Sequence, residues 1–250
     1  MSSSLFPLNV VQLDPPTLTT ADCDHYGKAD DGMDYAIKTA NGKNPKAPAA
    51  EWCCHELATA CGIAVPTFAI LQMPDKTEAF GSRWEGGVTQ DTQIITQILT
   101  GGLPSNSLAA RLSAIFAFDL FVFNDDRHTN NYLFRTGWGS DYSVLAYDFS
   151  RAWTYHSWPL PKGALPTGCQ TMKYYRAIQK HQPFDSKAAH AVLKTLRELP
   201  VRVIQDSVNK MPSSWLDKKV KNAIVKWWGS KDRAERIDFL KKGISDGTLL

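Results

Sequence analysis

The chain has 250 residues, 43% of them hydrophobic, and is therefore long enough to bury a core as one two-part unit or as two small domains. Its 28 basic and 25 acidic residues leave a net charge of +3, which gives no signal for a polyanion, so no nucleic-acid partner is expected. No run approaches the roughly 20 apolar residues of a membrane span, and the first residues lack the basic and apolar blocks of a signal peptide.

The cysteines favour a reducing compartment. Their number is odd and none stands in a C-x-x-C motif, so buried free thiols are expected rather than a zinc site. Free thiols suit the reducing cytosol. We therefore expect a cytoplasmic protein without a membrane span. The cysteines are Cys23, Cys53, Cys54, Cys61 and Cys169.

The first third of the chain is predicted to form a small sheet with one helix. Alternating apolar and polar residues indicate the strands, and Gly or Pro residues end the segments. In the strand at 33–39, Tyr35 and Ile37 share one face. Lys38 falls on the other face, beside Ala36. The expected elements are a strand at 5–13, a loop at 17–32, the strand at 33–39, a loop at 41–48, a helix at 49–61, and strands at 65–73 and 79–84.

The rest of the chain is predicted to be mostly helical. Gly86 and Gly87 suit a hinge, so we expect one domain at 1–86 and a second at 87–250. The segment at 112–123 is apolar on nearly all sides, which predicts a buried helix. The other expected elements are a helix at 92–99, a hairpin with strands at 131–135 and 144–147, an irregular aromatic stretch after Pro161, and helices at 186–199, 201–210, 214–228 and 231–242.

A polar loop follows the predicted buried helix, at 124–131. Asp126 and Asn131 stand five residues apart in it, and Asp148 ends the second hairpin strand. Phosphotransferases use such a set: one carboxylate faces the nucleophile, while an amide oxygen and a second carboxylate hold Mg²⁺. Two alternatives stay open. Asp125 could replace Asp126, and the loop could be an Asp/Asn-rich turn that only caps the helix.

Lys38 on its strand would pair with the phosphates of a nucleotide, held by a carboxylate of the next helix. Glu51 and Glu56 are both candidates for that carboxylate. Between Thr20 and Gly32 no G-x-G-x-x-G motif is present, so any cover over the phosphates would be unconventional.

Four other polar residues lie near these groups. His128 could contact the γ-phosphate or only make structural hydrogen bonds. Arg127 and Arg151 could neutralise phosphate charge or brace carboxylates. Asp119 interrupts the apolar helix and needs a partner if buried, for which Arg127 or the loop amides are nearest.

The order of these motifs resembles that of HipA-like kinases. The likeness rests on Ile37-Lys38, the helix with Glu51 leading to Gly62-Ile-Ala-Val-Pro66, the loop at 124–131, and Ala146-Tyr-Asp-Phe149. The D-R-H-x-x-N core of the loop is also similar to phosphatidylinositol 3- and 4-kinases. Ser150 stands where the D-F-G element of kinases has glycine.

The resemblance implies an α+β, bilobal protein-kinase-like fold, with a small β-rich N-lobe carrying one helix and a mostly helical C-lobe. It implies ATP and Mg²⁺ as cofactors, Asp126 as the catalytic aspartate, and Lys38 paired with Glu51. Asn131 and Asp148 would be the metal ligands. The adenine-binding strand would lie near Phe80, Ser82 and Trp84.

The function expected from this resemblance is phosphorylation of a serine or threonine hydroxyl, on another protein or on the chain itself. The expected partners are ATP and a protein substrate, with an antitoxin or regulatory protein if the chain is a toxin-like regulator. Two other functions stay open: a pseudokinase that binds nucleotide without transfer, and a lipid or small-molecule kinase.

Overall fold

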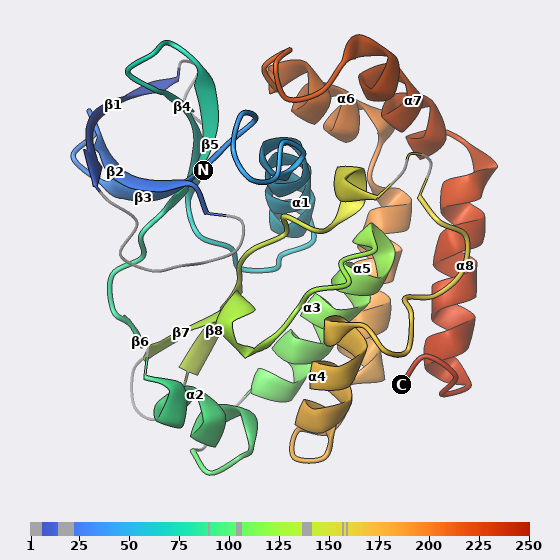
Figure 1. Cartoon of the computed structure of the whole chain (residues 1–250). Helices are drawn as coiled ribbons and strands as arrows, with labels where there is room; N and C mark the ends of the chain where they lie inside the picture. The colour runs from blue at the N-terminus through green and yellow to red at the C-terminus, as the bar shows by residue number, and fades with distance from the viewer. Residues whose placement is uncertain are drawn as a thin grey trace.

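The computed structural model describes residues 7–14, 23–89, 91–103, 107–136, 142–156, 158 and 160–250. Strands gather at one end of the molecule and helices at the other, with helix α1 (Ala47–Ala60) between them (Figure 1). Mixed α and β structure was expected from the sequence, and it is confirmed.

The amino-terminal strands form a closed five-stranded barrel, where a small sheet was expected. Their order around the barrel is β1-β2-β3-β5-β4, and a parallel pairing of β1 with β4 closes it. The strands are β1 (Leu8–Asp14), β2 (His25–Ala29), β3 (Asp34–Thr39), β4 (Phe68–Gln72) and β5 (Glu78–Arg83). Closure leaves neither β1 nor β4 as an open edge.

The alternation predicted for β3 is confirmed. Tyr35 and Ile37 are buried inside the barrel with Leu71 of β4. Lys38 points the other way and is buried as well, at 2% exposure. The side of β3 that carries Lys38 therefore faces α1 and the rest of the molecule.

Strand β2 lies in the segment predicted as a loop, so that prediction was wrong for 25–29. The loop was predicted because Gly27 lies in this segment, and glycine usually indicates a turn. A Cβ on Gly27 would lie 2.5 Å from the carbonyl oxygen of Gln12 on β1. The glycine therefore serves close approach of two strands, not a turn. Residues 17–22 of the same predicted loop lie outside the described residues.

Helix α1 begins with Pro48 in its first turn and ends before Gly62, whose φ is +72°. Its residues are buried on nearly every side, since the barrel covers one flank and helices cover the other. Beyond it, β6 (Val88–Thr89), β7 (Tyr132–Thr136) and β8 (Tyr142–Ala146) make a three-stranded sheet. The predicted hairpin is confirmed as β7 and β8, whereas β6 was not predicted.

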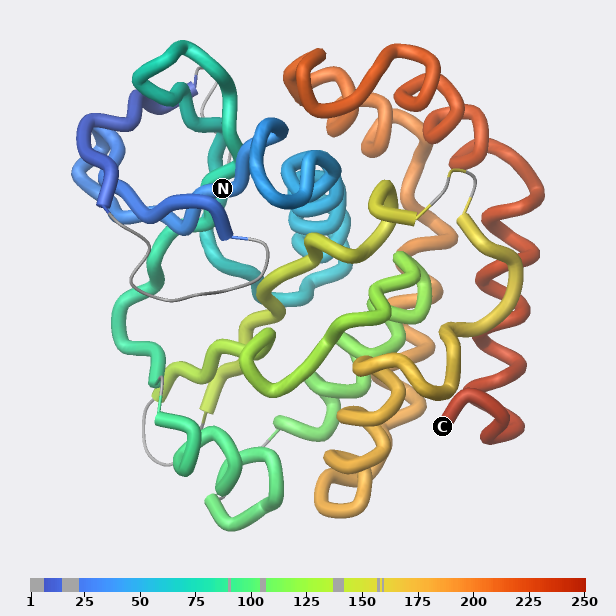
Figure 2. Tube along the Cα trace, in the orientation of Figure 1, coloured from blue at the N-terminus to red at the C-terminus, as the bar shows by residue number. Residues whose placement is uncertain are grey.

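Helix α3 (Leu108–Val122) is the buried helix predicted from its apolar sequence. Helix α5 (Ser186–Glu198) packs along it, and α8 (Lys231–Ser245) packs against both. The tube trace in Figure 2 follows the chain through this array. The remaining helices are α2 (Thr92–Leu99), α4 (Gln170–Gln179), α6 (Val201–Lys210) and α7 (Lys218–Trp228), joined by 3-10 turns at Thr129–Asn131 and Trp153–Tyr155.

Helices α2 and α6 match their predicted bounds, while two other predictions were wrong. Helix α4 falls in the stretch predicted to be irregular. Helix α7 begins at Lys218 rather than at 214, because the Asp217 side chain accepts the amide of Val220 and caps the helix. Trp215 lies before that cap and donates its indole N–H to the carbonyl oxygen of Glu78.

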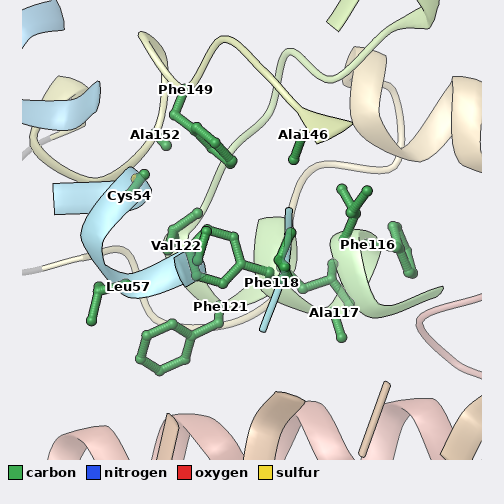
Figure 3. Packing of buried hydrophobic residues seen from close by; sticks show 14 of the residues in the cluster. Cys54, Leu57, Phe116, Ala117, Phe118, Phe121, Val122, Ala146, Phe149 and Ala152 are labelled. Carbon is green, nitrogen blue, oxygen red and sulfur yellow. The ribbon is translucent and has the colours of Figure 1, made fainter. Parts of the chain in front are cut away.

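The main core lies between α1, α3 and the hairpin, and Figure 3 shows the Phe149 ring directed into it beside α1 and α3. A second part of this core is a cluster of aromatic rings around Phe121, with centroid distances of 6.0–6.2 Å to Trp153, Trp227 and Trp228. All five cysteines are free thiols, as expected, but only Cys23, Cys53 and Cys54 are fully buried. No helix in the described part of the chain is both long and apolar enough to cross a bilayer.

Replacing Phe121 by alanine should lower the free energy of unfolding by about 3–5 kcal/mol, because a fully buried ring among three indoles leaves a cavity. Phe239 is the matched control, since it is a helical phenylalanine with 44% exposure. Urea unfolding of both variants measures the difference, and equal losses for Phe121→Ala and Phe239→Ala would contradict it.

Candidate active site

The polar loop at 124–131 starts where α3 ends. Phe123 takes the left-handed conformation there, with φ of 57°, and stops the helix. The Asn124 amide donates to the carbonyl oxygen of Asp119, and its side chain donates to Asp119 Oδ1 at 2.8 Å. Thr171 of α4 ties the loop from the other side, since its hydroxyl donates to Asn124 O and accepts the Arg127 amide. Loop geometry is thus fixed by both helices.

A buried ion pair between Asp119 and Arg127 lies under the loop. Nε and Nη2 of Arg127 each donate to one oxygen of Asp119 at 2.9 Å, and neither side chain exceeds 1% exposure. Burial works against the charge of Arg127, yet Asp119 holds the pKa of Arg127 above its usual range. The pair confirms the partner suggested for Asp119, and Arg127 is placed to brace it rather than to reach a phosphate.

Arg127 also joins the loop to the end of the hairpin. Its Nη1 donates to the carbonyl oxygen of Asn131 at 2.8 Å and to that of Tyr147. The guanidinium lies 4.6 Å from the ring centroid of Phe149, in a cation–π contact. One side chain therefore sets the distance between the loop and the segment that carries Asp148.

The Lys38 ammonium lies among three polar side chains, those of Glu51, Asp148 and Ser150. Its nitrogen lies 2.5 Å from Glu51 Oε1, 2.9 Å from Asp148 Oδ1 and 2.6 Å from Ser150 Oγ. Burial opposes the charge, but the two carboxylates hold the pKa of Lys38 well above its ordinary value. Lys38 is thus a fixed cation.

The structure distinguishes between the two candidate carboxylates of α1. Glu51 is 1% exposed and also accepts the Phe149 amide at 3.0 Å, whereas Glu56 lies near Lys210 at the surface. His55 is buried against Glu51, and its Nδ1 donates to the Glu51 carbonyl oxygen at 2.9 Å. Burial lowers the pKa of His55 from 6.5 to about 3, so the ring is neutral.

Asp126, Asn131 and Asp148 are brought together by the hairpin register. The Tyr147 amide donates to Asn131 O at 3.1 Å, which places Asp148 next to Asn131 across the hairpin. Asn131 Nδ2 donates to Asp126 O at 2.8 Å, so its amide oxygen is left to accept a further partner. The hydrogen bonds described for the Asp148 carboxylate all go to Oδ1. Two hard oxygens therefore suit a divalent cation such as Mg²⁺.

Asp126 and its neighbours lie at the open side of the loop. Asp126 Oδ2 is 3.5 Å from Nε of Arg151, and burial raises the pKa of Asp126. Asp125 turns instead toward His156, at 3.7 Å, which favours Asp126 as the residue beside Asn131. His128 accepts the Asn130 amide through Nδ1 at 3.3 Å, a structural role that keeps it within the loop.

A cavity of about 390 Å³ opens between the barrel and the three-stranded sheet. Ser82 and Trp84 line it, as does Ala36, two residues before Lys38. Phe80 does not line it: its ring is fully buried against His55 and Phe68. Phe80 and Ser82 share a face of β5 by period-two alternation, but only Ser82, nearer the end of the strand, reaches the cavity.

The sequence around this site is similar to a known protein family. A family model described as HipA-like kinase matches residues 23–145. The sequence of that segment is therefore similar to HipA-like kinases. It contains Lys38, Glu51, Asp126 and Asn131, and it ends just before Asp148. No curated protein sequence matches the chain significantly.

Two solved structures are similar to the chain in fold. The proinflammatory kinase CtkA of Helicobacter pylori has a TM-score of 0.64 at 11% identity, over 96% of this chain and 99% of that chain. HipA of Shewanella oneidensis, solved with HipB and operator DNA, has a TM-score of 0.53 at 12% identity. That match covers 84% of this chain and 60% of HipA. The chain therefore shares the fold of these proteins.

Sequence reasoning missed the part that two residues play in the candidate site. Thr171 lies 40 residues beyond Asn131 in a stretch without a recognisable helical pattern, so nothing linked it to the loop. Ser150 was noted only as a departure from D-F-G, although its hydroxyl contacts Lys38, Glu51 and Asp148. The sequence signal for Ser150 is a small hydroxyl two residues after Asp148, close enough to bond its carboxylate.

Asp119→Ala should lower the free energy of unfolding by about 3–5 kcal/mol, because it leaves the charge of Arg127 buried without a partner. Glu235→Ala on the exposed Lys231–Glu235 pair is the control and should cost less than about 0.5 kcal/mol. Chemical denaturation measures both. A loss for Asp119→Ala no larger than that of the control would contradict the bracing role.

Stability should fall as the pH drops from 6.5 toward 3, in part through His55. The unfolded chain binds this proton at a higher pH than the folded chain, so the contribution is present above pH 6.5 and is lost on acidification. His55→Gln should reduce the slope of unfolding free energy against pH by up to about 1.4 kcal/mol per pH unit. The exposed His181→Gln is the control, and identical slopes for both variants would contradict this assignment.

Proposed function

We propose that the protein is an ATP- and Mg²⁺-dependent kinase that transfers the γ-phosphoryl group to a serine or threonine hydroxyl of a protein, or of the chain itself. The observation that carries this proposal is the contact of Lys38 with both Glu51 and Asp148, next to a loop that presents Asp126 and Asn131. The HipA-like match supports it.

In this proposal the molecule works as two lobes, with residues 1–86 as the N-lobe and 87–250 as the C-lobe. The cavity lined by Ser82 and Trp84 would take the nucleotide base, because it lies beside the strand that carries Lys38. A cavity of about 390 Å³ falls within the range of small-molecule sites. Phe80 would support that strand from the core.

Each polar residue has a role that follows from its contacts. Lys38, held by Glu51, presents a fixed positive charge to the phosphates. Asn131 and Asp148 would hold Mg²⁺, which would neutralise charge on the phosphates. Asp126 accepts the proton of the substrate hydroxyl. As the hydroxyl oxygen bonds to the γ-phosphorus, the bond between the γ-phosphorus and the bridging oxygen of the β-phosphate breaks, and ADP leaves. The raised pKa of Asp126 suits proton acceptance.

A regulatory role and a protein partner are further parts of the proposal. The Shewanella oneidensis HipA belongs to a toxin–antitoxin system with HipB. A toxin-like regulator of the cytoplasm, held by an antitoxin or another regulatory protein, would be consistent with that likeness.

A second candidate is a pseudokinase that binds nucleotide without transfer. The Arg151–Asp126 ion pair favours it, because Asp126 is engaged before any substrate arrives. In the kinase proposal, the same pair orients Asp126 and is partly exposed, with side-chain exposures of 36% and 25%, so it can part at little cost.

Incubation with labelled ATP and Mg²⁺ separates the two candidates. Wild-type protein should incorporate phosphate into itself or into a general protein substrate. Asp126→Ala should reduce the rate by about a hundredfold or more, because a positioned base contributes at least that factor. Asp148→Ala should abolish metal-dependent transfer.

Asp206→Ala on the exposed face of α6 is the matched control and should keep the wild-type rate. Equal incorporation by wild type, Asp126→Ala and Asp148→Ala would end the kinase assignment. Thermal stabilisation by ATP and Mg²⁺ with no incorporation would instead establish the pseudokinase.

A further inference from the structure

The hydroxyl of Ser150 lies at the centre of three charged groups. It is 2.6 Å from Lys38 Nζ, 2.7 Å from Asp148 Oδ1 and 3.1 Å from Glu51 Oε1. Ser150 is 1% exposed, so these contacts are shielded from water. A buried hydroxyl with one cation and two carboxylates in reach is a built site rather than a chance surface contact.

The hydrogen atoms of this cluster can be assigned by elimination. The ammonium of Lys38 can only donate, so Ser150 Oγ accepts from it. Ser150 then has a single proton for two acceptors. The contact with Asp148 is shorter by 0.4 Å than the contact with Glu51, which assigns the proton to Asp148. The Ser150 amide also donates to Asp148 Oδ1, at 3.2 Å.

These bonds fix the orientation of the Asp148 carboxylate. Oδ1 accepts from Lys38 and twice from Ser150, which directs the other oxygen away from the cluster. Asp148 has a left-handed backbone conformation, with φ of 59°, which is uncommon for a residue other than glycine. The hydrogen bonds to Oδ1 therefore fix the direction of its side chain.

We infer that Ser150 is a positioning residue that orients Asp148 for a divalent cation and couples that carboxylate to Glu51 of α1. This inference rests on the proposed function and deepens it. The hydroxyl also lies 3.1 Å from Glu51 Oε1, so it links the Asp148 carboxylate to α1 while the other Asp148 oxygen is left for the cation. Glycine at this position would keep the amide bond to Asp148 Oδ1 but supply none of the three hydroxyl contacts.

Metal affinity is the property that tests this role. Ser150→Ala should raise the Mg²⁺ concentration for half-maximal binding of a non-hydrolysable ATP analogue by about tenfold, the lower end of what a lost outer-shell bond costs. Binding of the same analogue in EDTA should change little, because the hydroxyl acts through Asp148. Ser150→Thr keeps a hydroxyl and should recover most of the Mg²⁺ affinity. Isothermal titration with Mg²⁺ and with Mn²⁺ measures each value.

Ser207→Ala on α6 is the matched control, since Ser207 is also 1% exposed. Melting temperatures show which variants are folded, and Ser150→Gly tests the same hydroxyl if the alanine variant does not fold. Equal Mg²⁺ dependence in Ser150→Ala and Ser207→Ala would overturn the inference. An equal loss of analogue binding with and without Mg²⁺ would overturn it too, because that result indicates a structural role.

The same titrations keep the two proposals apart. Ser150-dependent Mg²⁺ affinity in a wild-type protein that transfers no phosphate would overturn the kinase proposal and support this inference. Phosphate transfer with a Mg²⁺ affinity independent of Ser150 would support the kinase proposal and overturn this inference. A wild-type protein that binds neither the analogue nor Mg²⁺ would overturn both.

Discussion

The buried ion pair between Asp119 and Arg127 is the interaction on which the site depends. Removing two charges from water is costly, and a pair of this kind is retained only when further hydrogen bonds satisfy both partners. Here the guanidinium donates to both carboxylate oxygens of Asp119 and to the backbone carbonyl oxygens of Asn131 and Tyr147. The only acidic residue of an otherwise apolar helix thereby positions a loop and the end of a hairpin at once.

Asp148 is the junction between this ion pair and the Lys38 cluster. Its carbonyl oxygen lies 3.5 Å from Arg127 Nη1, and its carboxylate accepts from Lys38 and Ser150. The backbone of Asp148 is therefore tied to α3 and the loop, while its side chain is tied to β3 and α1. Movement of the barrel relative to the helices would strain the bonds on one side or the other.

Local patterns in the sequence were enough for much of the fold and for the polar constellation. Alternation in 33–39 placed Lys38 outside the barrel interior, and an all-apolar run gave the buried α3. Features that depend on distant residues were not predictable. Closure of the barrel needs β1 to meet β4, and the glycine of β2 has its reason only in the neighbouring strand. Likewise, only distant residues distinguish the two glutamates of α1: Glu51 meets Lys38 and the Phe149 amide, whereas Glu56 lies near Lys210.

The tryptophan cluster has a practical consequence. Trp153 follows Ser150 by three residues, and its ring lies 5.3 Å from that of Trp158 and 6.1 Å from those of Trp227 and Trp228. Indoles this near one another exchange excitation energy, and their emission is sensitive to polarity. The protein thus carries a built-in optical reporter on the segment after Asp148, which would register rearrangement there without any added label.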